Sequence, residues 1–187
     1  MSLAPKHNAP VSWEPEYSTL LGLMRHVIAI LLQNEAGALT RVTGLISARG
    51  YNIESLSVAP TNDPTVSRVT LVTTGSDAVI AQINAQLLKL VDVVAVEDMT
   101  SGDTLARELL LIKLRLFAQH VDSAAALVRR AAGRVLSSNP SIYIVELAGT
   151  ELEIGEFIAR LGALGEIIEV VRSGVVGIAR GNPIEDI

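Results

Sequence analysis

The stretch that decides the fold is residues 34–56, NEAGALTRVTGLISARGYNIESL, which passes from a turn through a helix into a strand. Apolar residues recur every three or four positions from Leu39 through Val42 to Ile46, which predicts an amphipathic helix. Gly50 stands where a left-handed residue commonly ends a helix. The following IESLSVAP alternates in polarity, so we expect a strand over residues 53–60 with Leu56 and Val58 facing inward.

The same series of elements occurs twice along the chain. A strand at residues 26–32 precedes this helix, and a strand at 67–74, a helix introduced by Ser76 and a strand at 91–99 follow it. The second half has a strand at 108–116, a helix face within 125–132 and two strands within 134–149. A helix opened by the capping-box pair Thr150 and Glu153 and strands within 166–181 complete it. We therefore predict an α+β protein of two tandem ferredoxin-like βαββαβ domains.

The domain boundaries follow from composition. Residues 1–23, interrupted by Pro5, Pro10 and Pro15, are expected to be a flexible N-terminal extension. Their short apolar patch lacks the features of a signal peptide, so we expect a cytoplasmic protein. The first domain is predicted at 24–100 and the second at 104–187. Each sheet would carry its helices on one face and leave the other face and an edge free to pair, which predicts oligomers.

Composition excludes several classes of function. The 187 residues are 49% hydrophobic but only 3% aromatic, so the core is aliphatic. Cysteine is absent, which excludes disulfides, thiolate metal sites and cysteine nucleophiles. A formal net charge of -5 argues against binding to a nucleic-acid backbone, which requires a basic face. The apolar runs are of strand length, too short to span a membrane.

The sequence offers no catalytic constellation. His7, His26 and His120 are far apart and have no metal-ligand spacing. The glycines near the C-terminus do not form a dinucleotide-binding motif and follow a strand without opening a helix. We therefore expect no catalytic residue and no metal site in this chain.

The turn at residues 34–39 is a candidate binding site. Asn34 and Gly37 stand immediately before a helix, where free N–H groups and the helix dipole can hold a carboxylate. Asn34 offers both a donor and an acceptor, and Asn52 beyond the helix could receive an ammonium group. On spacing alone, an ordinary turn with a helix cap explains the same residues.

At these residues the sequence resembles a known family. QNEAGALTRVTGLISARGYNIESLSVAP, SRVTLVTT and KLVDVVAVEDM are similar to the ACT domain of the regulatory small subunit of acetolactate synthase (acetohydroxyacid synthase), and VELAGT and IEVVRSGVVGIARG resemble that family's C-terminal domain. The similarity covers about residues 24–181, which leaves out the N-terminal extension. It implies a chain without its own catalytic centre that binds the catalytic subunit, raises its activity and makes it sensitive to valine or another branched-chain amino acid.

The resemblance also implies where ligands bind. Thiamine diphosphate, magnesium and FAD are expected on the catalytic subunit and none on this chain. The effector would lie between the ACT domains of a homodimer, with Ala38 and Ile53 contributing backbone contacts by adjacency. The implied effector-binding residues are Asn34, Ala36, Gly37, Ala38, Leu39, Asn52 and Ile53. The corresponding turn of the second domain, residues 118–122, lacks the Asn-x-x-Gly arrangement, so that domain is expected to serve assembly or activation, or simply packing.

Three other interpretations remain at this point. A free-standing ACT-domain sensor could regulate a different biosynthetic enzyme, because the fold alone does not name its partner. An RNA-binding module shares the βαββαβ order but requires exposed aromatics and basic charge, which this chain lacks. A small enzyme of ferredoxin-like fold would require turnover by the isolated chain.

Overall fold

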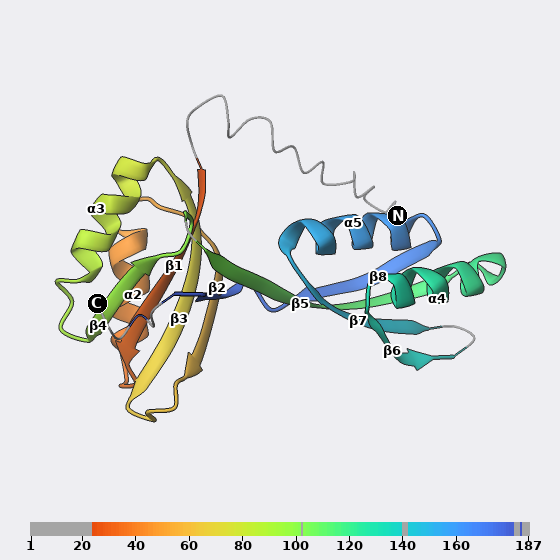
Figure 1. Cartoon of the computed structure of the whole chain (residues 1–187), viewed down its shortest axis with the longest axis horizontal. Coiled ribbons are helices and arrows are strands. Elements are labelled where there is room, and N and C mark those ends of the chain that lie inside the picture. The colour runs from red at the N-terminus through yellow and green to blue at the C-terminus, as the bar shows by residue number, and fades with distance from the viewer. Residues whose placement is uncertain (1–23, 102, 140–141, 182–183, 185–187) are drawn as a thin grey trace, which may run out of the picture.

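The computed structural model describes residues 24–101, 103–139, 142–181 and 184, so the predicted extension at residues 1–23 lies outside the described part. Two modules, each a sheet with two helices, lie side by side and are joined by the long strand β5 (Figure 1). This arrangement confirms the predicted α+β class and the repeated ferredoxin-like order.

The N-terminal module is a four-stranded antiparallel sheet in the order β2-β3-β1-β4. Its elements are β1 (Met24–Gln33), α2 (Ala38–Ser47), β2 (Ile53–Pro60), β3 (Val66–Gly75), α3 (Asp77–Leu87) and β4 (Val93–Asp98). Helix α2 ends as predicted, because Gly50 has φ of 75° and the two capping hydrogen bonds run from its N–H to the Ser47 carbonyl and from the Tyr51 N–H to the Ile46 carbonyl. Apolar side chains of β1, β3, α2 and α3 form the core.

The C-terminal module repeats this plan in the order β6-β7-β5-β8. Its elements are β5 (Thr104–Leu116), the 3-10 turn η1 (Ala118–His120), α4 (Val121–Arg130), β6 (Arg134–Ser138), β7 (Tyr143–Gly149), α5 (Glu151–Gly162), β8 (Gly165–Arg172) and β9 (Val176–Ala179). The predicted capping box is confirmed, since the Glu153 N–H donates to the Thr150 hydroxyl and the Thr150 N–H donates to the Glu153 carboxylate. The Thr150 N–H and, to a lesser extent, its hydroxyl lower the pKa of Glu153.

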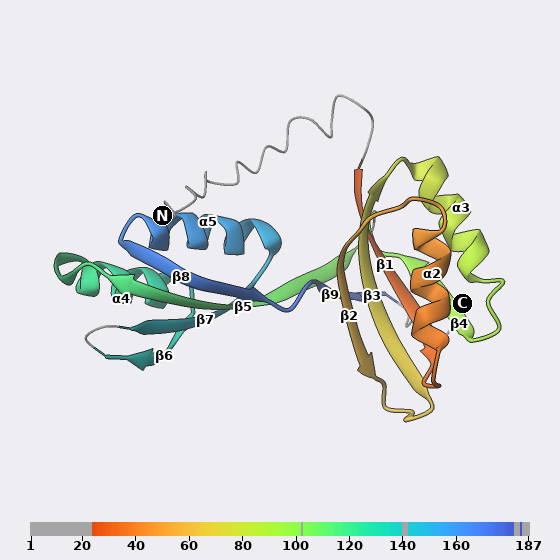
Figure 2. The same ribbon diagram turned by 180° about the vertical axis from the view of Figure 1, so that it is seen from behind.

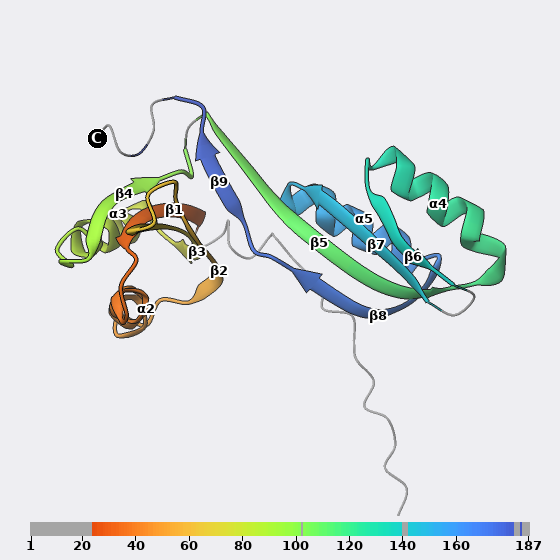
Figure 3. The same cartoon turned by 90° about the horizontal axis from the view of Figure 1, so that it is seen from below.

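The expectation that the second face of each sheet is free is wrong for the N-terminal module. The start of β5 pairs with β9, and this pair lies on the side of the N-terminal sheet away from α2 (Figure 3). On this face, Ala29 and Leu31 of β1 form a second apolar cluster with Met99, which follows β4, and with Ile184 near the C-terminus. The physical reason is that HVIAILL is apolar at consecutive positions, so β1 needs cover on both faces.

The Val58 side chain points inward as predicted, but it is not buried. Val58 lies opposite Val69 in the antiparallel pair of β2 with β3, so both side chains are on the helix face. Val69 is fully buried, whereas Val58 is 42% exposed. The difference arises because β2 is an edge strand and Val58 has a neighbouring strand on one side only.

Gly174 lies close to Ser55 of the N-terminal module, which yields the first prediction. Its φ is 77°, and a Cβ at this position would lie 3.1 Å from the Ser55 Cβ on β2. We expect Gly174→Ala to lower the free energy of unfolding by about 1–3 kcal/mol, because it adds left-handed strain and a contact with Ser55. Thermal and denaturant unfolding would measure the change.

Gly155 on α5 is the matched control, since nothing lies within 4 Å of its Cβ position. Gly155→Ala should leave stability unchanged or raise it by about 0.5–1 kcal/mol, because alanine favours the helix. Equal stability of the two variants would contradict both the left-handed strain at Gly174 and the contact of its added Cβ with Ser55.

Candidate effector site

Two hydrogen bonds link the turn after β1 to the loop between β2 and β3. The Asn34 N–H donates to the Thr65 carbonyl at 2.7 Å, and the Asn34 side-chain amide nitrogen donates to the Pro64 carbonyl at 3.0 Å. The Asn34 Oδ1 accepts no hydrogen bond from any described residue. The side chain is exposed, so this carbonyl oxygen is available as an acceptor at the end of the strand.

Helix α2 begins without a side-chain cap. Gly37 occupies the N-cap position with φ of 87° and ψ of -13°, and its carbonyl accepts the first helical hydrogen bond, from the Arg41 N–H at 3.0 Å. The Ala38 N–H donates to the Glu35 carbonyl at 3.2 Å and is therefore not free to bind a ligand. Within the described residues, the N–H groups of Gly37, Leu39 and Thr40 have no acceptor.

A partly buried ion pair that spacing did not reveal lies beside this turn. The Arg41 Nε is 2.5 Å from Asp92 Oδ2, and its Nη2 is 2.8 Å from Asp92 Oδ1. The Asp92 side chain is 5% exposed and the Arg41 side chain 47% exposed. A Cβ on Gly37 would lie 3.1 Å from Arg41 Nη1, so the guanidinium covers the backbone of the turn.

The hydrogen bonds of this pair dominate its titration. The Arg41 guanidinium lowers the pKa of Asp92, and Asp92 raises the pKa of Arg41, in each case against the opposing effect of desolvation. The Asp92 carbonyl also accepts from the Gln33 N–H at 2.8 Å, which fixes the end of β1. The turn thus presents free N–H groups and a fixed cation on one surface, a combination suited to a carboxylate.

The other predicted effector-binding residues lie in two places, at the start of α2 and at the start of β2. Ala36 is exposed in the turn, whereas Ala38 is buried and Leu39 partly buried on α2. Asn52 is exposed after α2, its carbonyl accepts from the Thr73 hydroxyl at 2.6 Å, and Ile53 begins β2.

One chain does not bring Asn34 and Asn52 together. Ile53 pairs with Thr73, and Thr73 pairs with His26, seven positions before Gln33 on β1. This separation corresponds to about 23 Å along the strand. Helix α2 runs along the sheet between the two ends (Figure 2). A site that uses both asparagines therefore requires two chains.

The described residues contain no group of three or more His, Asp or Glu side chains that could hold a metal ion. His26 is 2% exposed, and its ring nitrogens lie 3.7 Å from Asp77 and from Asp98. His7 lies outside the described residues. No helix in the described part of the chain is long and apolar enough to cross a membrane.

Comparison with known proteins places this geometry in a family. Residues 28–95 match the model of the AHAS small subunit-like ACT domain, and residues 107–181 match the model described as the small subunit of acetolactate synthase. The chain belongs to the acetolactate synthase small-subunit family. The first match contains all the predicted effector residues and runs from β1 to β4, and the second runs from β5 to the end of β9.

Individual members of the acetolactate synthase small-subunit family agree along almost their whole length. The acetolactate synthase isozyme 3 small subunit of Escherichia coli (strain K12) is 46% identical over 161 residues, covering 86% of this chain and 99% of that protein. The acetolactate synthase small subunit of Haemophilus influenzae is 40% identical over 158 residues, covering 84% and 97%. The crystal structure of the acetolactate synthase small subunit from Thermotoga maritima superimposes with a TM-score of 0.77 at 30% identity, covering 85% and 99%.

The pair of Arg41 and Asp92 yields a prediction on acid stability. Because the pKa of Asp92 is lower in the folded than in the unfolded chain, its carboxylate stabilises the fold above the unfolded pKa, near 3.9. That contribution is lost as the pH falls through the lower folded pKa. We expect Asp92→Asn to be less stable than the parent above about pH 5 and the difference to narrow below about pH 4.

Denaturant unfolding at a series of pH values measures this difference. Asp122→Asn on α4 is the control: within the described part of the chain, this exposed carboxylate has only the dipole of its own helix as a partner, so its variant should differ from the parent by no more than about 0.3–1 kcal/mol at any pH. A constant difference between Asp92→Asn and the parent from pH 7 to pH 3 would contradict the assignment.

Proposed function

We propose that this chain is the regulatory subunit that binds the thiamine-diphosphate-dependent catalytic subunit of acetolactate synthase, raises its activity and makes it sensitive to feedback inhibition by valine. The observation that carries the proposal is the uncapped start of α2 beside Asn34, in a chain that belongs to the small-subunit family. In this proposal, thiamine diphosphate, magnesium and FAD bind to the catalytic subunit in the cytoplasm, and this chain binds the effector alone.

The carboxylate of the amino acid would bind at the start of α2. The free N–H groups of Gly37, Leu39 and Thr40 and the positive end of the helix dipole favour an anion there. The Arg41 guanidinium is bound to Asp92 through Nε and Nη2, and its Nη1 lies beside Gly37, where it can donate to the carboxylate. These features support the assignment with Leu39 and Thr40 as donors in place of Ala38.

The ammonium group would require a second copy of the chain. Strand β2 is an edge strand, so two copies can pair through it and form one continuous sheet. In an antiparallel pair, the start of one β2 lies beside the end of the other. Pro60, at the end of β2, pairs with Ser67, and the neighbouring Val66 pairs with Gln33, next to Asn34. Asn52 of a second copy would thus lie at the same end of the joined sheet as Asn34, with β2 and β3 between them.

The selectivity between amino acids and the coupling of effector binding to the arrangement of the two copies should have the magnitudes usual in proteins. One methyl group more or less in an apolar pocket changes affinity by about 1–3 kcal/mol, so valine and isoleucine should differ modestly. The effector can act only through its preference for one arrangement of the two copies, and a coupling of about 1–3 kcal/mol is typical. In the C-terminal module the corresponding position is the turn η1 without a glycine, and we assign that module to assembly and activation.

Asn34→Ala tests the site. We expect the dissociation constant for valine to rise by roughly 10- to 150-fold, since a hydrogen bond to a charged group contributes about 1.5–3 kcal/mol. Inhibition of the reconstituted enzyme should weaken, whereas activation of the catalytic subunit should remain largely intact. Calorimetry with valine, leucine and isoleucine, together with assays of acetolactate formation, measures both effects.

Asn62→Ala is the matched control, because Asn62 is exposed in the loop between β2 and β3. It should bind valine like the parent chain. Unchanged affinity in Asn34→Ala would defeat the assignment of the site. Valine binding by a chain that neither binds nor activates an acetolactate synthase catalytic subunit would favour the alternative, a sensor that regulates a different biosynthetic enzyme.

Val58→Lys tests the interface. The side chain is apolar and 42% exposed on the edge strand, so a charge there should oppose pairing of two copies. We expect a monomer by light scattering and a loss of valine binding, because the site is shared. Val91→Lys, at a position already 84% exposed, is the control and should stay dimeric. A dimeric Val58→Lys chain with normal valine affinity would refute pairing through β2.

A further inference from the structure

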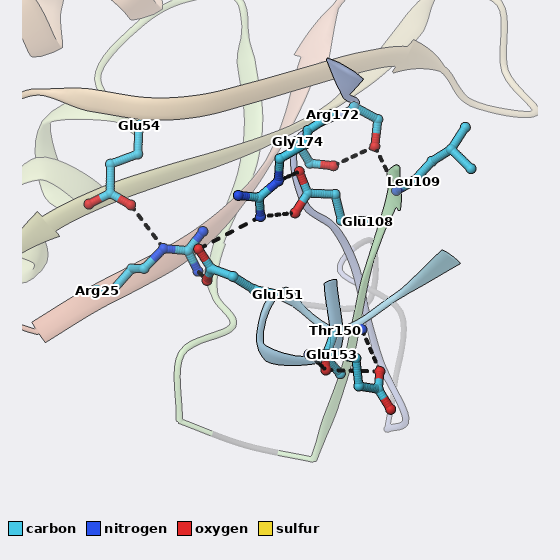
Figure 4. Close-up of polar contacts among 10 residues, drawn as sticks. Arg25, Glu54, Glu108, Leu109, Thr150, Glu151, Glu153, Arg172 and Gly174 are labelled. Carbon is cyan, nitrogen blue, oxygen red and sulfur yellow. Dashed lines mark hydrogen bonds and ion pairs between the residues drawn. The ribbon is translucent and has the colours of Figure 1, made fainter. Parts of the chain in front are cut away.

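Five charged side chains form a continuous series between the modules (Figure 4). We call this series the interdomain ion-pair chain; its members are Arg25, Glu54, Glu108, Glu151 and Arg172. They line a cleft of about 410 Å³ between β1 and β2 on one side and β5, α5 and β8 on the other.

Arg25 is shared between the two modules. Its Nε lies 2.9 Å from Glu54 Oε2 on β2 of the N-terminal module. Its Nη1 lies 2.8 Å from Glu151 Oε2 at the start of α5 in the C-terminal module. Among the described residues, no other ion pair links β1–β4 to β5–β8. Because the guanidinium holds two carboxylates from different modules, a displacement of one carboxylate alters the contact with the other.

The C-terminal end of the series is firmly held. Arg172 makes a two-pronged contact with Glu108, at 2.9 Å and 2.5 Å, and lies 3.9 Å from Glu151. Glu108 is 4% exposed, so the Arg172 side chain has a fixed partner. Glu151 therefore sits between a fixed cation of its own module and the cation shared with β1.

The N-terminal end lies at an irregular point of β2. The register of β2 against β3 shifts between Ile53 and Ser55, which places Glu54 in a β-bulge. The Thr74 hydroxyl donates to the Glu54 carboxylate, and Ser55 lies beside Gly174, where an added Cβ would be 3.1 Å from the Ser55 Cβ. The residues before this bulge are Asn52 and Ile53, which belong to the proposed effector site.

We propose that Arg25, shared between Glu54 and Glu151, transmits effector occupancy at the start of β2 to the C-terminal module. This inference rests on the proposed function, because it needs an effector held by Asn52 and Ile53. An effector that fixes the backbone at Ile53 restricts the bulge at Glu54, the next residue. The Arg25 guanidinium follows Glu54, and its contact with Glu151 changes with it. The coupling is the difference in stability of this contact between the free and the occupied state.

Glu151→Gln tests the transmission separately from binding. The change removes the charge that meets Arg25 and leaves the capping box of Thr150 and Glu153 in place, so α5 keeps its N-terminal cap. Because coupling is reciprocal, the dissociation constant for valine should change by no more than about two- to fivefold, far less than the change expected for Asn34→Ala. The ratio of the rates without and with saturating valine, measured on the chain reconstituted with its catalytic subunit, should fall by about two- to fivefold, as expected for an ion pair about one-third exposed.

Glu156→Gln is the matched control on the same helix. Glu156 is exposed and lies 3.9 Å from Arg160 of α5, so the same change of charge there breaks no contact between the modules. It should leave both valine affinity and inhibition unchanged. The double variant Arg25→Gln/Glu151→Gln should inhibit no more weakly than Arg25→Gln alone, because both changes remove the same contact.

Hydrogen exchange provides a readout that does not depend on valine. Glu151→Gln should raise amide exchange at residues 52–56 on the other module, and Glu156→Gln should not. If Glu151→Gln is inhibited by valine as fully as the parent and its amide exchange is unchanged, the proposal is overturned. The proposed function still stands in that case, provided that the parent chain binds valine. Absence of valine binding in the parent chain itself would overturn the proposed function and this regulatory role together.

Discussion

The structure depends on the burial of β1 from both sides. The even positions of the strand, such as Ile28 and Ile30, pack beneath α2 and α3, and Ala29 and Leu31 on the opposite face pack against the C-terminal segment. Apolar area on both faces of one strand cannot be covered by the two helices of a ferredoxin-like unit. After the C-terminal sheet, the chain therefore returns to the N-terminal module, and residues near the C-terminus cover the second face of its sheet. This contact fixes the position of one module relative to the other.

Much of the fold could be predicted from local patterns. Periodicity, the glycine after α2 and the capping box before α5 all act within a few residues, and each appears in the structure as expected. The cover on the second face of the N-terminal sheet was missed, although the unbroken apolar run of HVIAILL indicated it. The exposure of Val58 was missed, because the alternation of IESLSVAP gives the direction of a side chain and not the number of strands beside it.

The candidate site was predictable only in part. The positions of Asn34 and Gly37 at the start of a helix follow from the sequence, because glycine and asparagine favour such turns. The hydrogen bond from Ala38 to Glu35 and the ion pair of Arg41 with Asp92 could not be predicted. Arg41 and Asp92 are 51 positions apart, and Arg25 and Glu151 are further still, so their contacts exist only through tertiary packing.

The length of β5 has a mechanical consequence. This single strand of 13 residues pairs with β9 over the N-terminal sheet and with β7 and β8 in the C-terminal sheet. A hydrogen-bonded strand of about 43 Å resists bending at one point but tolerates a gradual change of twist. Any change in the angle between the modules would therefore have to twist β5 along its length.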